Sequence, residues 1–514
     1  MSTVVDDIAA HAARDPRAPA LVTPQGVMSY RELAGRIERL ALTLAAAGVR
    51  AEVRCVVAAE HTADAVIAMA AVMRAGGAFV TLDPGLPVAR LHAMVRSAQA
   101  RVQVTTAALS GRLGLPVPGP AVLIDEPVPG RPAQSTAAQI APTSVTPDTL
   151  AYISHTSGST GVPNPVLIEH GGLRAYLRFI AAHCELGPGT SVLQLAPVGY
   201  DASIRDIFAP LSAGSRLILL PRSTLLRPDA LADAVTEYGA DAILATTPTF
   251  LTALAQPDGV AARLGRLRLI VCAGESLRPF LAAGGRSLAA GRLVNHYGPT
   301  ECTITSTCYD VPAEPDTTAD LIGTPIPGVT VRLLDADRRP VPDGATGEIC
   351  IGGPGVARGY GGRPRLTAER FVPDPGGAPG ERLYRTGDLA RRRADGNLEF
   401  LGRADRQVKI RGYRIEPAEV EGALLTHPAV TGAVITPATD DLGRIYLIAH
   451  VTGVATDVTN AALRAHLART LPPHLLPRQF RRVDDIPATH SGKADRSALA
   501  GLGSAAGQAT PSPA

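Results

Sequence analysis

The sequence contains no tryptophan, and its six cysteines are scattered along the chain. No two cysteines form a CxxC pair, and none has a histidine at a metal-ligand spacing. This pattern argues against a disulfide framework and a structural metal site, and it favours buried or half-buried thiols. No apolar run approaches the roughly 18 residues that a membrane-spanning helix needs, and no basic-then-apolar signal sequence is visible. We therefore expect a cytoplasmic protein with no membrane segment.

Charge of either sign is also scarce. Charged residues make up 19% of the chain, and the 50 Lys+Arg residues nearly balance the 47 Asp+Glu residues. A dedicated nucleic-acid binder would show a clustered basic face, so no nucleic-acid partner is expected. The 46% of hydrophobic residues is ample for folding, and a length of 514 residues predicts two or more domains.

The sequence does contain a loop rich in glycine and hydroxyl groups. An apolar, strand-like run over 150–155 leads into Thr156, Ser157, Gly158, Ser159, Thr160 and Gly161. Glycines permit turns that point backbone N–H groups into one concavity, and the hydroxyls add further donors. Such a loop after a strand can hold a polyphosphate, although a Ser/Gly linker is the simpler alternative. Asn164 and Pro165 stand where a phosphate loop would be expected to offer a lysine and a small residue.

Strand and helix patterns alternate on both sides of this loop. Ser29 and Glu32 have capping-box spacing and open a helix that ends at Gly48. A strand over 54–59, a helix over 63–74 and a strand over 78–82 follow, whereas residues 113–148 are rich in Pro, Ala and Thr and predict a surface connection. Further strands are predicted over 216–220, 242–245, 267–272 and 293–297.

This rhythm implies parallel α/β architecture, in which ligands gather at the carboxyl ends of strands. The loops 200–206, 273–276 and 296–301 would then face the same crevice as the loop 156–161.

From about residue 331 the pattern changes to short strands broken by Asp, Gly and Pro, with a hairpin turn at Asp395-Gly396. A small unit follows, with predicted helices over 416–425 and 460–471 and strands over 433–436 and 445–451. The predicted fold class is α/β, with a large N-terminal domain of parallel α/β sheets, a small β-rich subdomain, and a small α+β C-terminal domain.

Four further stretches hold polar residues that a nucleotide site needs. Residues 297–301 place a ring, a hydroxyl and a carboxylate within one turn, and residues 384–388 offer another carboxylate. Residues 402–405 begin the small domain, and residues 491–496 put a lysine on a small-residue turn. Taken singly, each has a structural alternative: a half-buried loop residue, a turn carboxylate or a solvated lysine.

Taken together and in order, these stretches resemble the adenylation domains of nonribosomal peptide synthetases, in the superfamily that also holds acyl-CoA synthetases and luciferase. The resemblance covers nearly the whole chain. Its ten motifs are MSYREL (28–33), VMRAGGAFVTLDP (72–84), TSGSTG (156–161), YDAS (200–203), NHYGPTE (295–301), GEICIGGPGVARGY (347–360), YRTGDL (384–389), GRADRQVKIRGYRIEPAEVE (402–421), LPPHLLP (471–477) and SGKADR (491–496).

The resemblance implies an ATP-dependent, AMP-forming ligase that converts an α-amino acid and ATP to aminoacyl-AMP and pyrophosphate, in nonribosomal peptide biosynthesis. It implies a nucleotide-binding core over 1–402, a hinge over 403–405 and a mobile C-terminal domain over 406–500. The residues 501–514 read as a disordered tail.

The cofactors implied are ATP and Mg²⁺. The loop 156–161 would wrap the β- and γ-phosphates, and Tyr297 would pack on adenine between His296 and Gly298 of the same motif. Thr300 would contact the α-phosphate, and Glu301 would hold Mg²⁺.

The remaining implied roles belong to four residues nearer the C-terminus. Asp388 would bind the ribose hydroxyls with Arg403 beside it, and Asp405 would be the hinge. Lys493 would be catalytic, bridging the substrate carboxylate and the α-phosphate. No protein nucleophile is required, because the reaction needs alignment and cancellation of negative charge.

In amino-acid-activating relatives an aspartate at the position of Asp201 pairs with the substrate α-ammonium, and a helix N-cap is the alternative. Small residues in the side-chain pocket that the resemblance implies would leave room for a bulky, aromatic or cyclic substrate side chain. Arg205 in that pocket would bind a polar or acidic substrate group or pair with Asp206. The implied side-chain pocket is lined by Ala202, Arg205, Ala245, Val271, Ala273, His296, Ile304 and Thr305.

Only eighteen residues follow Arg496, and neither a GGxS-type attachment site nor an HHxxxDG motif is present. The resemblance therefore predicts a stand-alone enzyme that loads the phosphopantetheine thiol of a separate carrier protein, although a domain excised from a larger synthetase would look the same. A small activating helper protein is a further candidate partner.

Two other functions compete with this interpretation. An acyl- or aryl-CoA ligase would share the first half-reaction, but it would leave Asp201 without a cationic partner. A non-catalytic nucleotide-binding scaffold is suggested by Asn164 and opposed by the joint presence of Lys493, Glu301 and Asp388.

Overall fold

The computed structural model describes residues 2–125, 145–158, 161–440, 444–454, 458–487 and 494–501. By compactness the chain divides into two units. The first comprises Met1–Pro84, Met94–His155 and Asn164–Asp405, and the second comprises Gly85–Ala93, Thr156–Pro163 and Arg406–Ala514.

The first unit begins with two helices, and a capping box marks the N-terminus of each. Helix α1 (Val4–Arg14) begins at a capping box between Thr3 and Asp6. Helix α2 (Tyr30–Ala46) begins at the predicted box, in which the Ser29 side chain accepts from the Glu32 backbone N–H and Glu32 accepts from the Ser29 backbone N–H. Each box satisfies backbone donors that the first helical turn leaves without partners.

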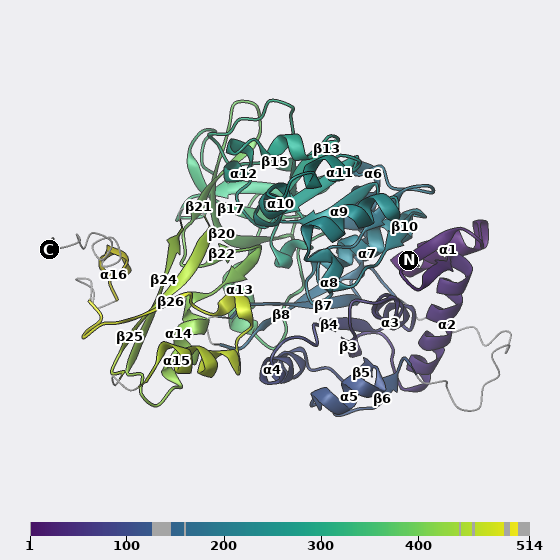
Figure 1. Cartoon of the computed structure of the whole chain (residues 1–514), viewed down its shortest axis with the longest axis horizontal. Coiled ribbons are helices and arrows are strands. Elements are labelled where there is room, and N and C mark those ends of the chain that lie inside the picture. The colour runs from purple at the N-terminus through teal and green to yellow at the C-terminus, as the bar shows by residue number, and fades with distance from the viewer. Residues whose placement is uncertain are drawn as a thin grey trace. The chain divides into compact units, whose positions relative to one another are not determined.

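A seven-stranded sheet follows, whose order is β18-β8-β7-β4-β3-β5-β6. Helix α3 (Ala63–Arg74), apolar over most of its length, packs beside β3 and β4 (Figure 1). The strands β6, β5, β3, β4 and β7 run parallel, and β8 pairs antiparallel with β18. The strands are β3 (Arg54–Ala58), β4 (Ala78–Leu82), β5 (Val102–Thr105), β6 (Ala121–Leu123), β7 (Leu150–Thr156), β8 (Asn164–Glu169) and β18 (Gly359–Tyr360).

Two predictions about this part of the chain need correction. The surface connection predicted over 113–148 contains strand β6, which extends the sheet beyond β5; residues 126–144 lie outside the described residues. Asn164 and Pro165 begin strand β8 rather than extending a loop, and the buried Pro165 accepts a hydrogen bond through its carbonyl from Gly361 N–H at 2.8 Å. Proline is compatible with this position because its carbonyl, not its missing N–H, makes that bond.

The larger sheet has 14 strands in the order β16-β17-β20-β21-β15-β14-β13-β12-β11-β9-β10-β1-β2, with β19 paired to β20. Along this order, the neighbouring pairs from β13 through β12, β11, β9 and β10 to β1 are parallel. The neighbouring pairs from β13 through β14, β15, β21, β20 and β17 to β16 are antiparallel. The strands of the parallel half and its edge are β1 (Pro19–Thr23), β2 (Gly26–Ser29), β9 (Ser191–Leu193), β10 (Arg216–Ile218), β11 (Ala242–Thr246), β12 (Leu269–Ala273) and β13 (Arg292–Tyr297).

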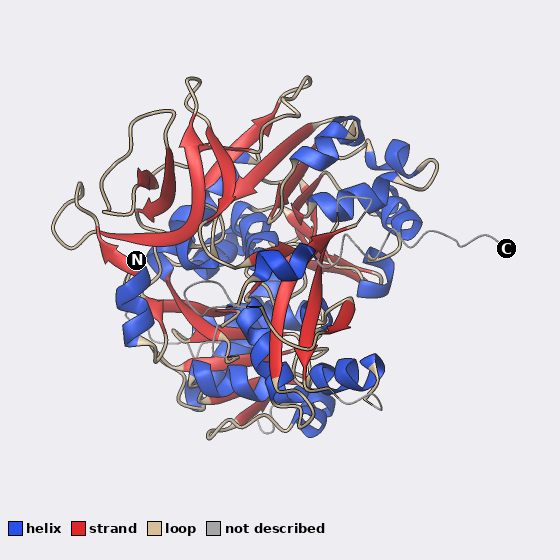
Figure 2. Ribbon diagram, turned by 90° about the vertical axis from the view of Figure 1, so that its left-hand side faces the viewer, coloured by secondary structure: helices blue, strands red, loops and turns tan. Residues whose placement is uncertain are grey.

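Both faces of the parallel half are buried. Leu244, Val271 and Val294 belong to one hydrophobic cluster, whereas the adjacent Ile270 and Leu293 belong to a second. Successive strand residues point to opposite faces, so this alternation means that other elements cover each side. Figure 2 distinguishes the helices, in blue, from the strands, in red. The helices of the first unit include α5 (Ala107–Leu113), α6 (His170–His183), α7 (Ala202–Ala213), α8 (Arg222–Leu225), α9 (Pro228–Glu237), α10 (Pro248–Ala255), α11 (Val260–Leu264), α12 (Arg278–Ala282), η1 (Gly285–Leu288), η2 (Thr300–Cys302) and α13 (Pro364–Arg370).

The antiparallel half is the predicted β-rich subdomain. The predicted Asp395-Gly396 turn joins β20 to β21, with φ of 83° at Gly396. The strands are β14 (Thr307–Val311), β15 (Leu321–Pro325), β16 (Thr330–Leu334), β17 (Thr346–Gly352), β19 (Phe371–Pro373), β20 (Arg382–Arg392) and β21 (Leu398–Arg403).

The second unit has a hydrophobic core of its own, in which Val420 and Leu424 contact Ile435, Leu463 and Leu467. Strand β25 pairs antiparallel with β24 and parallel with β26. Its elements are β22 (Val408–Ile410), β23 (Tyr413–Ile415), α14 (Pro417–Leu425), β24 (Gly432–Thr439), β25 (Ile445–Thr452), α15 (Asn460–Ala468), η3 (Pro473–Leu475), β26 (Gln479–Arg482) and α16 (Arg496–Gly501). Helix α4 (Val88–Ala98) crosses the boundary between the units.

The predicted fold class is confirmed: a large α/β part with a β-rich subdomain precedes a small α+β part. All six cysteines are thiols, five of them buried and Cys308 half-buried, as predicted. No helix in the described part of the chain is both long and apolar enough to cross a membrane. Of the tail predicted over 501–514, Gly501 ends helix α16 and the rest lies outside the described residues.

A substitution at Gly323 can test how tightly the strands beyond β13 are packed. Its φ is 75°, and a Cβ at this position would overlap the carbonyl of Cys308 on the neighbouring strand β14. Gly259 has the same φ of 75° but no atom within 4 Å of such a Cβ. Both Gly→Ala changes incur backbone strain of about 1–2 kcal/mol. Only Gly323→Ala adds the steric clash, so its thermal unfolding midpoint should fall several times further; equal decreases would contradict this packing.

Candidate active site

The carboxyl ends of β11, β12 and β13 bring predicted site residues together in the first unit. Ala245 is the penultimate residue of β11, and Ala273 ends β12 directly opposite His296 of β13. Parallel strands end at the same sheet edge, so residues far apart in sequence become neighbours. Among the predicted pocket residues, Val271 and Thr305 are buried, whereas Ala202 and Ala273 are half-buried.

The turn after β13 is closely packed. A Cβ on Gly298 would lie 2.6 Å from the carbonyl oxygen of Ile304, so only glycine permits this approach. Ser306 N–H donates to the carbonyl of Tyr297 at 2.8 Å, which closes the turn. Thr303 and Ile304 have positive φ of 56° and 73°, uncommon for β-branched residues. Such strained backbone is concentrated at functional sites in proteins, which is consistent with the predicted role of this turn.

Asp201 lies at the start of α7 but does not cap it. Its own φ and ψ are helical, and its side chain makes no capping hydrogen bond to the second or third helical residue. Burial raises the pKa of Asp201, while hydrogen bonding from the Thr300 side chain, on the turn after β13, and from the Ala202 backbone N–H lowers it by less. The N-cap alternative is therefore wrong, and Asp201 and Thr300 are brought together across the sheet edge.

Arg205 lies one helical turn beyond Asp201 and is 1% exposed. Its Nη1 donates to Nδ1 of His296 at 3.2 Å, and its guanidinium is also hydrogen-bonded to the Tyr176 side chain. The Tyr176 and Thr305 hydroxyls lie 3.2 Å apart. Arg205 Nε approaches Asp206 Oδ1 at 3.9 Å, so the predicted pairing with Asp206 is present as a long ion pair.

A second polar cluster joins β13 to the β20–β21 hairpin. The Tyr297 hydroxyl donates to Asp388 Oδ2 at 2.6 Å, and Arg403 Nη1 donates to the other carboxylate oxygen. Arg403 also binds both oxygens of Asp405, through Nε and Nη2 at 2.7 Å each, and the carbonyl of Thr386 at 3.0 Å. Burial, followed by the charge of Asp388, holds the pKa of Tyr297 well above its usual value, so the hydroxyl stays a proton donor.

Gly387 makes room for this cluster. Its φ is 74°, and a Cβ there would lie 2.6 Å from Asp405 Oδ2 and 3.0 Å from Arg403 Nη2. The predicted ribose, arginine and hinge residues are thus in direct contact inside the first unit.

Glu301 is 1% exposed and lies on the 3-10 turn η2. The Tyr360 hydroxyl donates to Glu301 Oε1 at 2.6 Å and lies 3.2 Å from the Tyr384 hydroxyl. Tyr360 belongs to β18, which pairs with β8, the strand that follows the predicted phosphate loop in the sequence. The sequence pattern did not identify Tyr360 as a functional residue, although it ends the motif at 347–360.

The predicted phosphate loop follows β7 directly. Thr156 ends that strand half-buried, and Gly161 has φ of 77° with its N–H donating to the carbonyl of Gly158 at 2.9 Å. Ser157 is half-buried, and Ser159 and Thr160 lie outside the described residues. The role of this loop stays a prediction.

Lys493 also lies outside the described residues, but its flanks are fixed within the second unit. Asp495 N–H donates to the carbonyl of Pro487 at 2.6 Å. Arg496 forms an ion pair with Glu421 at 2.7 Å and donates to the carbonyl of Ile435 at 2.8 Å. The catalytic role of Lys493 stays a prediction.

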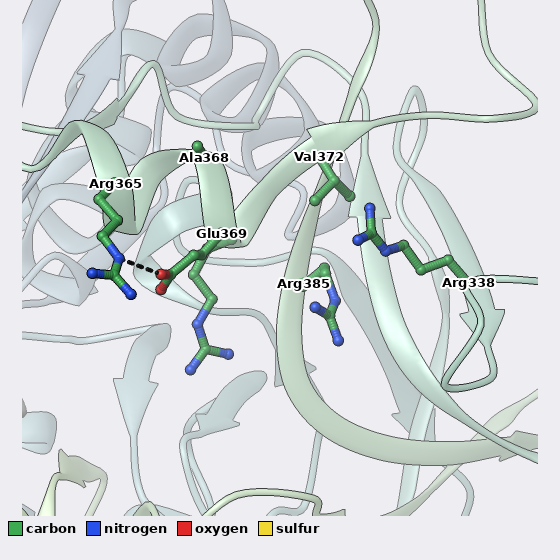
Figure 3. A pocket seen from close by; sticks show the side chains of 7 residues that line it. Arg338, Arg365, Ala368, Glu369, Val372 and Arg385 are labelled. Atoms are coloured by element: carbon green, nitrogen blue, oxygen red, sulfur yellow. Dashed lines mark hydrogen bonds and ion pairs between the residues drawn. The ribbon is translucent and has the colours of Figure 1, made fainter.

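A pocket of about 670 Å³ lies elsewhere in the first unit, near α13 and β20 (Figure 3). It contains none of the predicted site residues. Three of its four arginines are paired: Arg365 with Glu369 at 3.0 Å, Arg370 with Asp405 at 3.8 Å and Arg385 with Glu348 at 2.6 Å. Because these charges are matched within the protein, the pocket is not a candidate active site. It is lined by Arg338, Arg365, Ala368, Glu369, Arg370, Val372 and Arg385.

Comparison with known families agrees with this arrangement. Residues 8–361 match the AMP-binding enzyme family, and residues 419–493 match the AMP-binding enzyme C-terminal domain. The chain belongs to the AMP-binding enzyme family, and it is an ATP-dependent, AMP-forming ligase of the adenylating type that the motifs predict.

Two curated relatives are much longer synthetases. The chain is 39% identical over 490 residues to a linear gramicidin synthase of Brevibacillus parabrevis, covering 95% of this chain and 6% of that protein. It is 39% identical over 497 residues to phosphinothricin tripeptide synthetase PhsC of Streptomyces viridochromogenes, covering 95% and 44% respectively. The chain therefore spans less than half the length of either relative.

Two solved structures share the fold. An artificially fused adenylation–PCP di-domain from Klebsiella oxytoca, NpsA-ThdA, superposes with a TM-score of 0.81 at 26% identity, covering 94% of each chain. Holo-PA1221, a protein with adenylation and PCP domains bound to a vinylsulfonamide inhibitor, gives a TM-score of 0.82 at 29% identity, covering 97% of this chain and 84% of that one.

The Tyr360–Glu301 hydrogen bond can be tested directly. Tyr360→Phe removes the hydroxyl that fixes a predicted Mg²⁺ ligand, and loss of such a supporting contact typically weakens metal binding about 10- to 100-fold. We expect the Mg²⁺ concentration for half-maximal adenylation to rise by that factor at saturating ATP. Tyr309→Phe, a half-buried tyrosine of β14, is the control. An unchanged Mg²⁺ concentration for half-maximal adenylation would show that Tyr360 does not support Mg²⁺ binding.

Proposed function

We propose that this chain activates an α-amino acid with ATP, giving an aminoacyl adenylate and pyrophosphate, within nonribosomal peptide biosynthesis. The placement of Asp201 at the start of α7 beside Thr300, on the turn after β13, carries the proposal. It joins a carboxylate suited to the substrate α-ammonium to a hydroxyl suited to the α-phosphate of ATP. These are the two groups that adenylation must bring together, because the substrate carboxylate attacks the α-phosphorus.

ATP fits the cluster around Tyr297. The ring would lie against adenine while Asp388 accepts from the ribose hydroxyls, with Arg403 holding the carboxylate in place. His296 and Gly298 flank the ring, and Gly298 brings its turn close enough to shape the adenine site. The loop 156–161, through Thr156, Ser157, Gly158, Ser159, Thr160 and Gly161, would bind the β- and γ-phosphates.

Mg²⁺ fits Glu301. No group of three His, Cys, Asp or Glu side chains able to hold a metal occurs among the described residues. Mg²⁺ requires no such cage, because it is usually bound by one or two carboxylates together with substrate phosphates. A bound Mg²⁺ would neutralise phosphate charge, and Glu301, oriented by Tyr360, would fix its position.

The chain's own residues then position the reactants. Asp201 orients the amino acid through its ammonium, and the Thr300 hydroxyl turns from Asp201 to donate to an α-phosphate oxygen. Lys493 bridges that phosphate and the substrate carboxylate. The new bond joins a carboxylate oxygen to the α-phosphorus, and the bond from that phosphorus to the pyrophosphate breaks. Fixed donors around the developing negative charge supply most of the acceleration in such sites.

The hinge is assigned to Asp405, the last residue of the first unit. We infer domains over 1–402 and 406–500 with a hinge at 403–405, about which the smaller domain would turn between the half-reactions. Arg403 binds both Asp388 and Asp405, so the proposed ribose ligand and the proposed hinge share one guanidinium.

The proposed acceptor is the phosphopantetheine thiol of a carrier protein acting in trans, and a small helper protein is a further candidate partner. Both structural relatives named above join adenylation and PCP domains, which supports a carrier as partner. A CoA ligase is the main competing function, and Asp201 weighs against it because a plain acid would leave the half-buried carboxylate without a cation.

The chain has only two lysines, Lys409 and Lys493, so the proposed catalytic lysine can be followed chemically. Lys493→Ala should lower substrate-dependent ATP–pyrophosphate exchange about 100- to 1,000-fold, the usual cost of one well-placed donor. Lys409→Ala is the matched control. An amine-reactive label should be excluded from Lys493, relative to Lys409, when ATP and substrate are both bound. An unchanged rate of exchange in Lys493→Ala would show that Lys493 is not required for catalysis.

The phosphate loop gives a separate prediction. Asn164 replaces a lysine whose charge would meet the leaving pyrophosphate, and it now begins strand β8. Asn164→Lys should lower the apparent KM for ATP with little effect on kcat, whereas Asn164→Gln should leave KM unchanged. Identical KM values for the lysine variant and the parent would show that the loop backbone and hydroxyls suffice.

A further inference from the structure

The largest fully buried side chain of the first unit is a cation. Arg205 is 1% exposed, and its guanidinium lies among side chains from α6, α7 and β13. A buried charge is costly unless a partner of opposite charge and a full set of hydrogen bonds compensate it. The groups around Arg205 therefore show what kind of ligand it requires.

Asp206 compensates the charge of Arg205 only in part, through the long ion pair. Its Oδ2 accepts from the backbone N–H groups of Leu195 and Ala196 at 3.3 and 3.1 Å, so this oxygen is committed to the strand end. Its Oδ1 lies 3.9 Å from Arg205 Nε, beyond hydrogen-bond distance, and neither atom has a hydrogen-bond partner. Burial raises the pKa of Asp206 to about 7, which further weakens it as a counter-charge.

The other neighbours are neutral. Burial, followed by the charge of Arg205, holds the pKa of His296 well below its usual value, and burial raises the pKa of Tyr176 to about 12. His296 Nδ1 accepts from Arg205, so its proton resides on Nε2, which is buried without a partner. Two buried donors, Arg205 Nε–H and His296 Nε2–H, are left unsatisfied in one cluster.

This cluster lies one helical turn from the proposed amino-group site. Asp201 and Arg205 are four residues apart at the start of α7, so they share a helix face at a rise of about 6 Å. That separation suits a compact α-amino acid whose ammonium meets Asp201 and whose side chain reaches Arg205. Ala202 beside Asp201 and Ala273 at the end of β12 are small and half-buried.

We propose that the substrate side chain carries an anionic group, a carboxylate or a similar oxyanion, that binds Arg205 and accepts from His296. The inference rests on the proposed amino acid activation and names the class of amino acid that the site takes. It replaces the bulky aromatic or cyclic side chain predicted from the small pocket residues alone, because such a side chain would add no counter-charge to the long ion pair that the buried Arg205 makes with Asp206.

The direct test uses the unmodified full chain and matched pairs of amino acids in ATP–pyrophosphate exchange. Aspartate is compared with asparagine, glutamate with glutamine, and 2-aminoadipate with norleucine, with phenylalanine and proline as the neutral bulky and cyclic cases. We expect at least one anionic member to be favoured about 10- to 100-fold in kcat/KM over its neutral partner, the usual value of a charge-assisted hydrogen bond.

Arg205→Met keeps most of the side-chain volume and removes the charge. In this variant the preference for the anionic amino acid should fall below about threefold. The kcat/KM for the anionic substrate should decrease, and the kcat/KM for its neutral partner should not. Arg332→Met, which removes a part-buried arginine paired with Asp374, is the matched control and should keep the preference.

The outcomes separate the two proposals. Exchange with phenylalanine or proline and none with any anionic amino acid would overturn the anionic side chain and leave amino acid activation intact. Exchange with no amino acid would overturn activation itself, and the side-chain assignment with it. The comparison within the unmodified chain stands even where Arg205→Met fails to fold.

Discussion

The guanidinium of Arg403 is the interaction on which the candidate active site depends. It binds Asp388 on β20, Asp405 at the end of the first unit and the carbonyl of Thr386. Asp388 in turn accepts from Tyr297 at the end of β13. Asp388, held by Arg403, therefore ties the β-rich half of the large sheet to its parallel half, and it does so where the parallel strands end.

Arg205 presents the opposite case in the same unit. Arg403 is matched by two carboxylates at hydrogen-bond distance, whereas Arg205 has one carboxylate oxygen at 3.9 Å, and the other oxygen of that carboxylate accepts from backbone donors. A matched buried charge orders a structure, and an unmatched one requires a ligand. We infer that Arg403 holds the proposed nucleotide-binding residues in place, whereas Arg205 takes part in selecting the substrate.

Much of the fold follows from sequence pattern because periodicity and capping are local. Helix α3 and strand β4 have the predicted bounds, and α2 begins at the predicted capping box. Strand β6 was missed because its three residues lie in a proline-rich stretch with no periodicity. The contact of Tyr360 with Glu301 could not be predicted from spacing, since it joins residues 59 apart through the pairing of β18 with β8. The Thr300–Asp201 contact likewise depends on strand order, which local pattern does not encode.

We propose that the cluster of Tyr297, Asp388 and Arg403 binds the adenosine part of ATP. Calorimetric titration of AMP into the full chain and into Asp388→Asn tests it most directly, with 2′-deoxy-AMP as the second ligand. We expect that the unmodified chain prefers AMP over 2′-deoxy-AMP, and that Asp388→Asn binds AMP about 10- to 100-fold more weakly and loses the preference. Equal affinity of both proteins for AMP would contradict the assignment of Asp388 as the ribose ligand.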